Sequence, residues 1–220
     1  MTASAHGRRR GPLVVLDADS TLIREEAIEL LAEAAGSLEH VTDVTERAMR
    51  GELDFAESLR ERVATLAGLD VDVLASARER MTPTDGVHEL VDRVHAAGGL
   101  VGVVSGGFHE LLDPLADHLG LDFCRANRLE VSDGRLTGRV EGPVVDAAAK
   151  ARALDEWARS SGIPLARTVA VGDGANDLQM LGVAALGVAF CAKPVVREEA
   201  DVAIDTPDLS AVLPLLGLRG

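Results

Sequence analysis

The segment PLVVLDADSTL, residues 12–22, decides the fold. Residues 14–16 form an apolar run that predicts a short buried strand, and the run ends at Asp17. A second carboxylate, Asp19, follows two residues later. Two such neighbours disfavour each other's ionised form, so a cation or a proton is expected between them. A lone Asp after a strand often only caps the next helix, but that explanation accounts for one of the two carboxylates.

Three later apolar runs resemble the first one and are also followed by polar or glycine residues and helical periodicity. They are residues 100–104, 168–171 and 186–190. This alternation predicts an α/β fold with a largely parallel sheet. Ligands bind beyond the carboxyl ends of such strands. We therefore expect Asp17, Ser105 and Asp173 to meet at one edge of the sheet.

The chain divides into three predicted parts. Residues 1–11 are expected to be a loose tail, and residues 12–23 with 81–220 the α/β core. Residues 24–80 contain four amphipathic stretches and no strand pattern, which is more than a crossover needs, so we interpret them as an inserted helical cap. Residues 127–140 alternate around Asp133-Gly134, a two-residue signal for a small β-hairpin.

Composition excludes several classes of function. The net charge of −14 argues against binding to nucleic acid or to an anionic membrane, because both require basic surface. No apolar run approaches the length that spans a membrane. The two cysteines make no disulfide framework and no zinc spacing, which fits the reducing cytoplasm.

A second acidic motif, GDGAND at residues 172–177, strengthens the case for a cation. Several carboxylates at one sheet edge form an oxygen-rich site of the kind that Mg²⁺ accepts. Next to the metal, Asp17 stays ionised and can serve as a nucleophile. Asp19 points to the other side and can exchange a proton with a leaving oxygen and later with water, provided that its pKa is raised.

Three candidate anion-binding features have plainer alternatives. The sequence Ser105-Gly106-Gly107 is either a phosphate cradle at a helix start or an ordinary turn. Lys150 is either a fixed cation for phosphoryl transfer or a solvated lysine. Arg62 falls in the apolar stripe of its predicted helix. It either extends its stem over that surface or clamps a carboxylate from the cap.

Together, DADSTL, VVSGGF, Lys150 and VGDGAND resemble the four motifs of the haloacid dehalogenase superfamily, in its phosphatase branch. FAESLRERV, MTPTDG, ANRL, DGRLTG and AFCAKP further resemble the phosphoserine phosphatases, so the resemblance covers nearly the whole chain from Gly11 onward. It implies a Rossmann-like core with a helical cap, Mg²⁺ as cofactor, and hydrolysis of O-phospho-L-serine in the last step of serine biosynthesis.

The resemblance also implies roles for single residues. Asp17 is the nucleophile and a metal ligand, and Asp19 is the general acid/base and binds metal through its carbonyl. Asp173 completes the metal ligands, with Asp177 in support. The residues implied to hold the substrate are Glu26, Met49, Phe55, Arg62, Ser105, Gly106, Gly107, Lys150 and Asn176.

Alternatives remain open at this point. The same phospho-aspartyl chemistry serves a phosphotransferase that passes the group to an alcohol such as homoserine. A non-catalytic phosphoamino-acid binding protein is a third possibility, disfavoured because both aspartates are present. Ala18 stands where the family often has a bulkier residue, which affects packing more than chemistry. We expect a monomer or homodimer, and no control through an N-terminal regulatory domain.

Overall fold

A central sheet with strand order β4-β3-β2-β1-β5-β6-β7 organises the computed structural model, which describes residues 11–49 and 52–218. Within that described part, every pairing between neighbouring strands is parallel except that of β3 with β4. The predicted α/β class is therefore confirmed. The strands are β1 (Leu13–Leu16), β2 (Leu100–Phe108), β3 (Phe123–Ser132), β4 (Arg135–Glu141), β5 (Thr168–Gly172), β6 (Leu186–Phe190) and β7 (Val202–Ile204).

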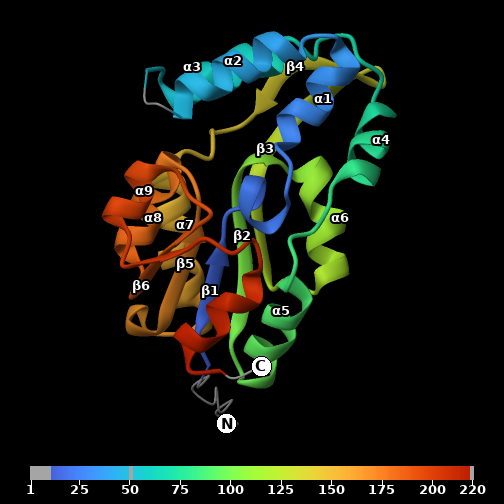
Figure 1. Cartoon of the computed structure of the whole chain (residues 1–220). Helices are drawn as coiled ribbons and strands as arrows, with labels where there is room; N and C mark the ends of the chain where they lie inside the picture. The colour runs from blue at the N-terminus through green and yellow to red at the C-terminus, as the bar shows by residue number, and fades with distance from the viewer. Residues whose placement is uncertain (1–10, 50–51, 219–220) are drawn as a thin grey trace.

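Helices cover both faces of the sheet, which gives three layers (Figure 1). Alternate residues of β1 serve the two faces, because successive side chains of a strand point in opposite directions. Leu13 and Val15 pack in the apolar cluster on the α7 side, whereas Val14 and Leu16 pack on the α5 side. The helices of these layers are α5 (Val87–Ala96), α6 (His109–Leu119), α7 (Ala147–Ser161), α8 (Leu178–Val183) and α9 (Pro194–Glu199).

Four further helices lie together at the end of the molecule toward which β1 points (Figure 1). The chain leaves the core after β1 and returns before α5 along neighbouring paths: the Arg24 N–H donates to the Thr82 carbonyl, and the Thr84 N–H donates to the Leu22 carbonyl. Such paired connections are what an inserted unit requires, and the assignment of residues 24–80 as a separate cap stays a prediction. The helices are α1 (Ala27–Ala35), α2 (Leu38–Met49), α3 (Phe55–Ala64) and α4 (Val73–Arg80).

The predicted hairpin is present, with β3 and β4 pairing antiparallel from the Arg128–Glu141 pair to the Ser132–Arg135 pair. Its turn lies at Asp133-Gly134, where both residues have positive φ, as a tight two-residue hairpin turn requires. The first part of β3, from Phe123, pairs in parallel with β2, so the hairpin is an extension of the main sheet. Through Leu129 and Leu136 the hairpin joins the apolar cluster of α1 and α3.

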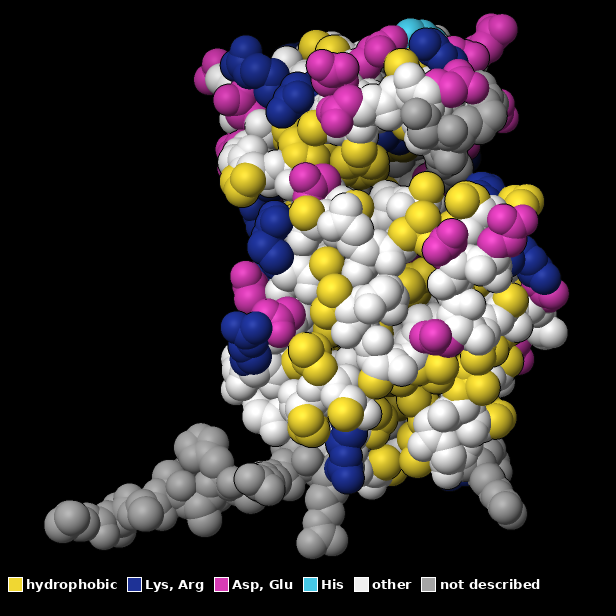
Figure 2. Space-filling view, turned by 90° about the vertical axis from the view of Figure 1, so that its left-hand side faces the viewer, with side chains coloured by type: hydrophobic (Ala, Val, Ile, Leu, Met, Phe, Trp, Pro, Cys, Tyr) yellow, Lys and Arg dark blue, Asp and Glu magenta, His cyan; other side chains and the backbone are white. Residues whose placement is uncertain are grey.

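The outer surface of this helical end is highly charged. Figure 2 shows Asp and Glu side chains interspersed with Lys and Arg over the upper end of the molecule. Such a mixed surface faces water, whereas the inner faces of α1, α2 and α3 line a cavity together with the carboxyl ends of the core strands. None of the helices within residues 11–49 and 52–218 combines the length and the apolar character that crossing a membrane demands.

Candidate active site

Asp17 and Asp19 occupy a sharp turn directly after β1. The backbone N–H of Asp17 continues the sheet by donating to the Val171 carbonyl of β5 at 2.9 Å, and Asp17 Oδ1 accepts from the Ala18 N–H at 2.7 Å. Ser20 adopts a φ of +56°, which reverses the chain within this turn. Asp19 Oδ1 accepts from the Ala27 N–H at 2.9 Å. The two carboxylates are therefore fixed by different elements.

A buried lysine joins two of the predicted site residues. Lys150 Nζ, fully buried, lies 2.7 Å from Asp17 Oδ1 and 2.7 Å from Asp177 Oδ1. Burial by itself lowers the lysine pKa, but the two carboxylates outweigh it and raise the pKa of Lys150 above its usual value. Asp177 Oδ2 accepts from the Asp173 and Gly174 N–H groups. Both Asp177 oxygens are thus engaged, and Lys150 is a fixed cation whose charge is stabilised by two carboxylates.

Negative charge nonetheless exceeds positive charge at this sheet edge. Carboxylate oxygens of Asp17, Asp173 and Asp177 lie within 4.8 Å of one another, and all three residues are buried. Burial and then repulsion by Asp177 raise the pKa of Asp17 and bring the pKa of Asp173 to about 7. Lys193 and Lys150 both lower the pKa of Asp173, but two lysines do not neutralise three carboxylates, so a further cation favours ionisation of the whole cluster. A site made of oxygen donors fits Mg²⁺.

Gly106 and Gly107 shape the backbone beside the acidic cluster. Ser105 Oγ accepts from the Gly107 N–H at 2.8 Å, which folds the segment after the regular part of β2. This extended segment runs through Phe108 and α6 begins only at His109, so the helix start that we expected at Ser105–Gly107 lies further along the chain. A Cβ on Gly106 would lie 2.6 Å from Phe55 Cζ. The absence of a side chain there lets α3 approach the core.

Arg62 reaches the same place from α3. Its side chain is only 6% exposed, although it carries a full charge. Nε donates to the Ser58 carbonyl at 3.1 Å and Nη1 donates to Thr45 Oγ1 at 3.1 Å. Among the described residues no carboxylate lies within the 4.0 Å ion-pair distance of the guanidinium. Burial lowers the pKa of Arg62, and Glu26 and Asp19 only partly oppose this effect.

Glu26 faces Arg62 from the start of α1. Ser20 Oγ donates to Glu26 Oε1 at 2.9 Å. Burial, followed by the charge of Asp19, raises the pKa of Glu26 to about 8. The carboxyl group is therefore poorly compensated and would be stabilised as an anion by a positively charged ligand group.

One cavity connects these groups. It lies between α1, α2 and α3 on one side and the carboxyl ends of β1, β2 and β5 on the other. Its apolar wall includes Phe55, and the side chain of Met49 lies outside the described residues. Lys150, Ser105 and Asp177 stand behind the wall. The polar and charged side chains that line it are Asp17, Asp19, Glu26, Thr45, Arg62, Asp173 and Asn176.

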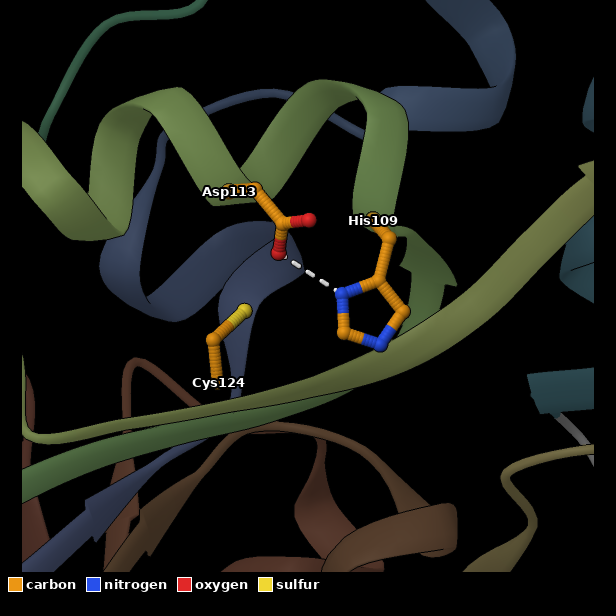
Figure 3. Close-up of side chains that lie close together, drawn as sticks. All are labelled: His109, Asp113 and Cys124. Atoms are coloured by element: carbon orange, nitrogen blue, oxygen red, sulfur yellow. Dashed lines mark hydrogen bonds and ion pairs between the residues drawn. The ribbon is translucent and has the colours of Figure 1, made fainter.

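A second group of potential metal ligands lies on α6 and β3 (Figure 3). The Ala126 N–H donates to His109 Nε2 at 3.1 Å, so the neutral ring carries its proton on Nδ1 and donates it to Asp113 Oδ1 at 2.7 Å. Burial and the neighbouring Asp113 raise the pKa of the Cys124 thiol to about 12. With both ring nitrogens engaged, this group is a hydrogen-bonded support for the start of α6.

Two residues near the site escaped the sequence analysis. Thr45 contacts Arg62, and Asn127 binds the Gly106 carbonyl through Nδ2 while its Oδ1 accepts from the Val145 N–H, both at 2.8 Å. Neither contact has a local sequence signal, because each joins segments that are distant along the chain. For Asn127 the hint is its place in ANRL, and for Thr45 it is that a polar residue interrupts an otherwise apolar helix face.

Comparison with known proteins decides the family. The family model of haloacid dehalogenase-like hydrolases matches residues 14–182. A phosphoserine phosphatase of Streptococcus thermophilus is 51% identical over 204 residues, which are 93% of this chain and 95% of the relative. The chain belongs to the phosphoserine phosphatase family of the haloacid dehalogenase-like hydrolases.

Other phosphoserine phosphatases are longer than this chain. The enzyme of Streptomyces coelicolor is 55% identical over 218 residues, 99% of this chain but 53% of the relative.

Among solved phosphoserine phosphatases, a structure described as a phospho-aspartyl intermediate analogue has a TM-score of 0.90 at 44% identity and covers 96% of this chain and 100% of that chain. A substrate-bound complex also has a TM-score of 0.90 at 44% identity, with coverages of 95% and 99%.

Proposed function

We propose that this chain is a Mg²⁺-dependent phosphoserine phosphatase that hydrolyses O-phospho-L-serine to L-serine and phosphate. The observation that carries the proposal is the charge pattern of a single cavity. At one end of the cavity lies the carboxylate cluster, with Lys150 behind it. At the other end lie Arg62, which has no carboxylate partner among the described residues, and Glu26, whose pKa is raised. A phosphorylated amino acid has complementary groups at matching ends.

The cap end sets the orientation of the substrate. Arg62 would bind the serine carboxylate, because its planar fork can make two parallel hydrogen bonds to that group. Glu26 would bind the ammonium group, and the positive charge would in turn lower the pKa of Glu26 from about 8. Phe55 supplies an apolar wall, and Met49 is proposed to do the same.

The core end holds the metal and the phosphoryl group. Asp17, Asp173 and the Asp19 carbonyl would hold Mg²⁺, with Asp177 supporting them through Lys150. When bound, the ion neutralises the carboxylate cluster and attracts the phosphate dianion. The residues proposed to hold the phosphoryl group are Ser105, Gly106, Gly107 and Lys150, and Asn176 is proposed to lie at the edge of the substrate.

The reaction uses the two aspartates in turn. An Asp17 carboxylate oxygen attacks phosphorus, the bond to the serine oxygen breaks, and Asp19 gives its proton to the leaving oxygen. Burial raises the pKa of Asp19, which supports its role as the proton donor. Asp19, now ionised, takes a proton from water as the water attacks the phospho-aspartyl group. Phosphate leaves, and both aspartates return to their starting forms.

The proposal includes a place in metabolism. The reaction completes serine biosynthesis, and we expect it in the cytoplasm, in keeping with the free thiols of Cys124 and Cys191. The substrate is a small molecule, and no role for nucleic acid or membrane is proposed.

The test is a comparison of phosphate release from four substrates with Mg²⁺: phosphoserine, phosphothreonine, phosphoethanolamine and p-nitrophenyl phosphate. We expect the highest kcat/KM with phosphoserine. Parallel reactions contain homoserine as acceptor, and phosphohomoserine is quantified by mass spectrometry. Transfer that outpaces hydrolysis would identify a phosphotransferase. Phosphoserine binding without phosphate release would identify a binding protein. No preference for phosphoserine would overturn the proposed substrate.

A further inference from the structure

Arg62 has to be aimed before it can clamp a carboxylate. Its guanidinium is buried, and it stands on a side chain with several rotatable bonds. Within its own helix it is held by one contact, from Nε to the Ser58 carbonyl, four residues earlier. That contact holds Nε, but the planar guanidinium can still tilt as a whole about this hydrogen bond, so one contact does not fix the direction of its terminal nitrogens.

Thr45 supplies the second contact from a different helix. Its Oγ1 accepts from Arg62 Nη1 at 3.1 Å, and the Thr45 residue is 4% exposed. Thr45 lies on α2 and Arg62 on α3, so the bond crosses the interface between two helices. A hydrogen bond to a charged donor in a buried place is stronger than one between neutral groups at the surface.

Both residues also border the cavity that contains Asp19 and Glu26. Thr45 is therefore placed where it can fix the direction of the fork without blocking it. With Nε and one Nη1 proton committed to Ser58 and Thr45, the remaining donors of the guanidinium are available to a ligand.

We propose that Thr45 is a positioning residue that determines specificity for a substrate carboxylate by orienting Arg62. This inference rests on the proposed function, because it requires Arg62 to bind the serine carboxylate. A hydroxyl at position 45 is needed for recognition of phosphoserine and is irrelevant to substrates that have the phosphate and ammonium groups alone.

The experiment compares phosphoserine with phosphoethanolamine, which lacks the carboxylate. Thr45→Val keeps the shape of the side chain and removes the acceptor. We expect KM for phosphoserine to rise about tenfold, since a hydrogen bond to a charged group is lost, with a smaller change in kcat. Kinetic constants for phosphoethanolamine should change less than about twofold. Thr45→Ser retains the hydroxyl and should restore most of the phosphoserine affinity.

Thr42→Val is the matched control. Thr42 lies on the same helix and donates to Glu29 Oε1 at 3.1 Å, but it does not line the cavity. We expect phosphoserine kinetics of this variant to equal those of the unmodified protein. Circular dichroism and thermal denaturation establish that each variant folds. Thr45→Ala gives the same comparison if the valine variant does not fold.

Either of two results in Thr45→Val would overturn the role of Thr45: an equal loss for both substrates, or no loss at all. Failure of Thr45→Ser to restore phosphoserine affinity would do so as well. Arg62→Ala separates this inference from the proposed function. A phosphoserine-specific loss in Arg62→Ala with an unaffected Thr45→Val contradicts only the role of Thr45. An equal loss for both substrates in Arg62→Ala contradicts the carboxylate clamp itself.

Discussion

Lys150 Nζ lies 2.7 Å from Asp17 Oδ1, and both side chains are almost completely removed from water. The pair joins the end of β1 to the first turns of α7, and the same lysine contacts Asp177. The sequence left two interpretations of Lys150, a solvated lysine or a fixed cation, and its two buried ion pairs support the fixed cation.

Replacing this lysine should damage both activity and stability. Lys150→Met leaves two buried carboxylates without their cation, so we expect a loss of about a hundredfold or more in kcat and a lower Tm. Steady-state kinetics with Mg²⁺ and thermal denaturation measure the two effects. Arg159→Met, an exposed change on the same helix, is the control. Activity of Lys150→Met within about tenfold of the unmodified protein would contradict the role given to Lys150.

The acidic cluster predicts how stability depends on pH in the metal-free protein. The folded-state pKa is raised from 3.8 to about 7 for Asp173 and from 4.5 to about 8 for Glu26. The folded state therefore binds protons more tightly than the unfolded state, and stability falls as pH rises between about 4 and 8. Mg²⁺ competes with these protons, so it should raise Tm more at about pH 8 than at about pH 5.

Thermal denaturation with Mg²⁺ or with chelator measures this difference. Each kcal/mol of stabilisation corresponds to roughly 2–4 °C in a chain of this size. Asp173→Asn removes one of the titrating groups, so the increase in Tm caused by Mg²⁺ should differ less between the two pH values. An increase in Tm with Mg²⁺ that is the same at both pH values would show that the carboxylates do not form the metal site.

The contact between Gly106 and Phe55 predicts a further effect on activity. Gly106→Ala places a methyl group 2.6 Å from Phe55 Cζ, so the ring has to move out of its place against the core. We expect kcat/KM for phosphoserine to fall about tenfold, since small displacements of binding groups are costly in catalysis. In Gly182→Ala the added methyl group meets no atom within 4 Å, so kcat/KM should not change. Unchanged kinetics in Gly106→Ala would show that this close approach is not required.

The two cysteines should differ in their reaction with iodoacetamide. The pKa of Cys124 is raised to about 12 by burial and by Asp113, and the residue is only partly accessible. Cys191 is exposed, and its pKa is raised mainly by burial. Because the thiolate is the reactive form, Cys191 should be alkylated first at about pH 8. Peptide mass spectrometry follows both sites, and faster labelling of Cys124 would contradict the hydrogen-bonded group of Figure 3.

The sequence predicts the site best where its polar residues come directly after a strand of the parallel sheet. The carboxyl ends of parallel strands share one edge, so the sequence pattern alone predicts the meeting of Asp17 with Asp173. The three-residue strand β7 could not, because so short an apolar run is indistinguishable from a loop. Thr45 and Asn127 were also missed, since their contacts depend on how helices and loops pack after folding. For Arg62, helical spacing left open whether the side chain covers apolar surface or clamps a carboxylate. The structure adds that its guanidinium is buried and is held by Ser58 and Thr45.

The central claim is that Asp17 becomes phosphorylated by phosphoserine, and trapping this species tests it most directly. The Mg²⁺-loaded protein is mixed with phosphoserine, quenched in acid and digested, and the peptide that contains Asp17 is examined by mass spectrometry. We predict one added phosphoryl group on Asp17 that hydroxylamine removes, accumulation of this species in Asp19→Asn with p-nitrophenyl phosphate, and none in Asp17→Asn. A hydroxylamine-sensitive phosphoryl group on Asp17→Asn, or hydrolysis of phosphoserine by that variant at an undiminished rate, would contradict the account.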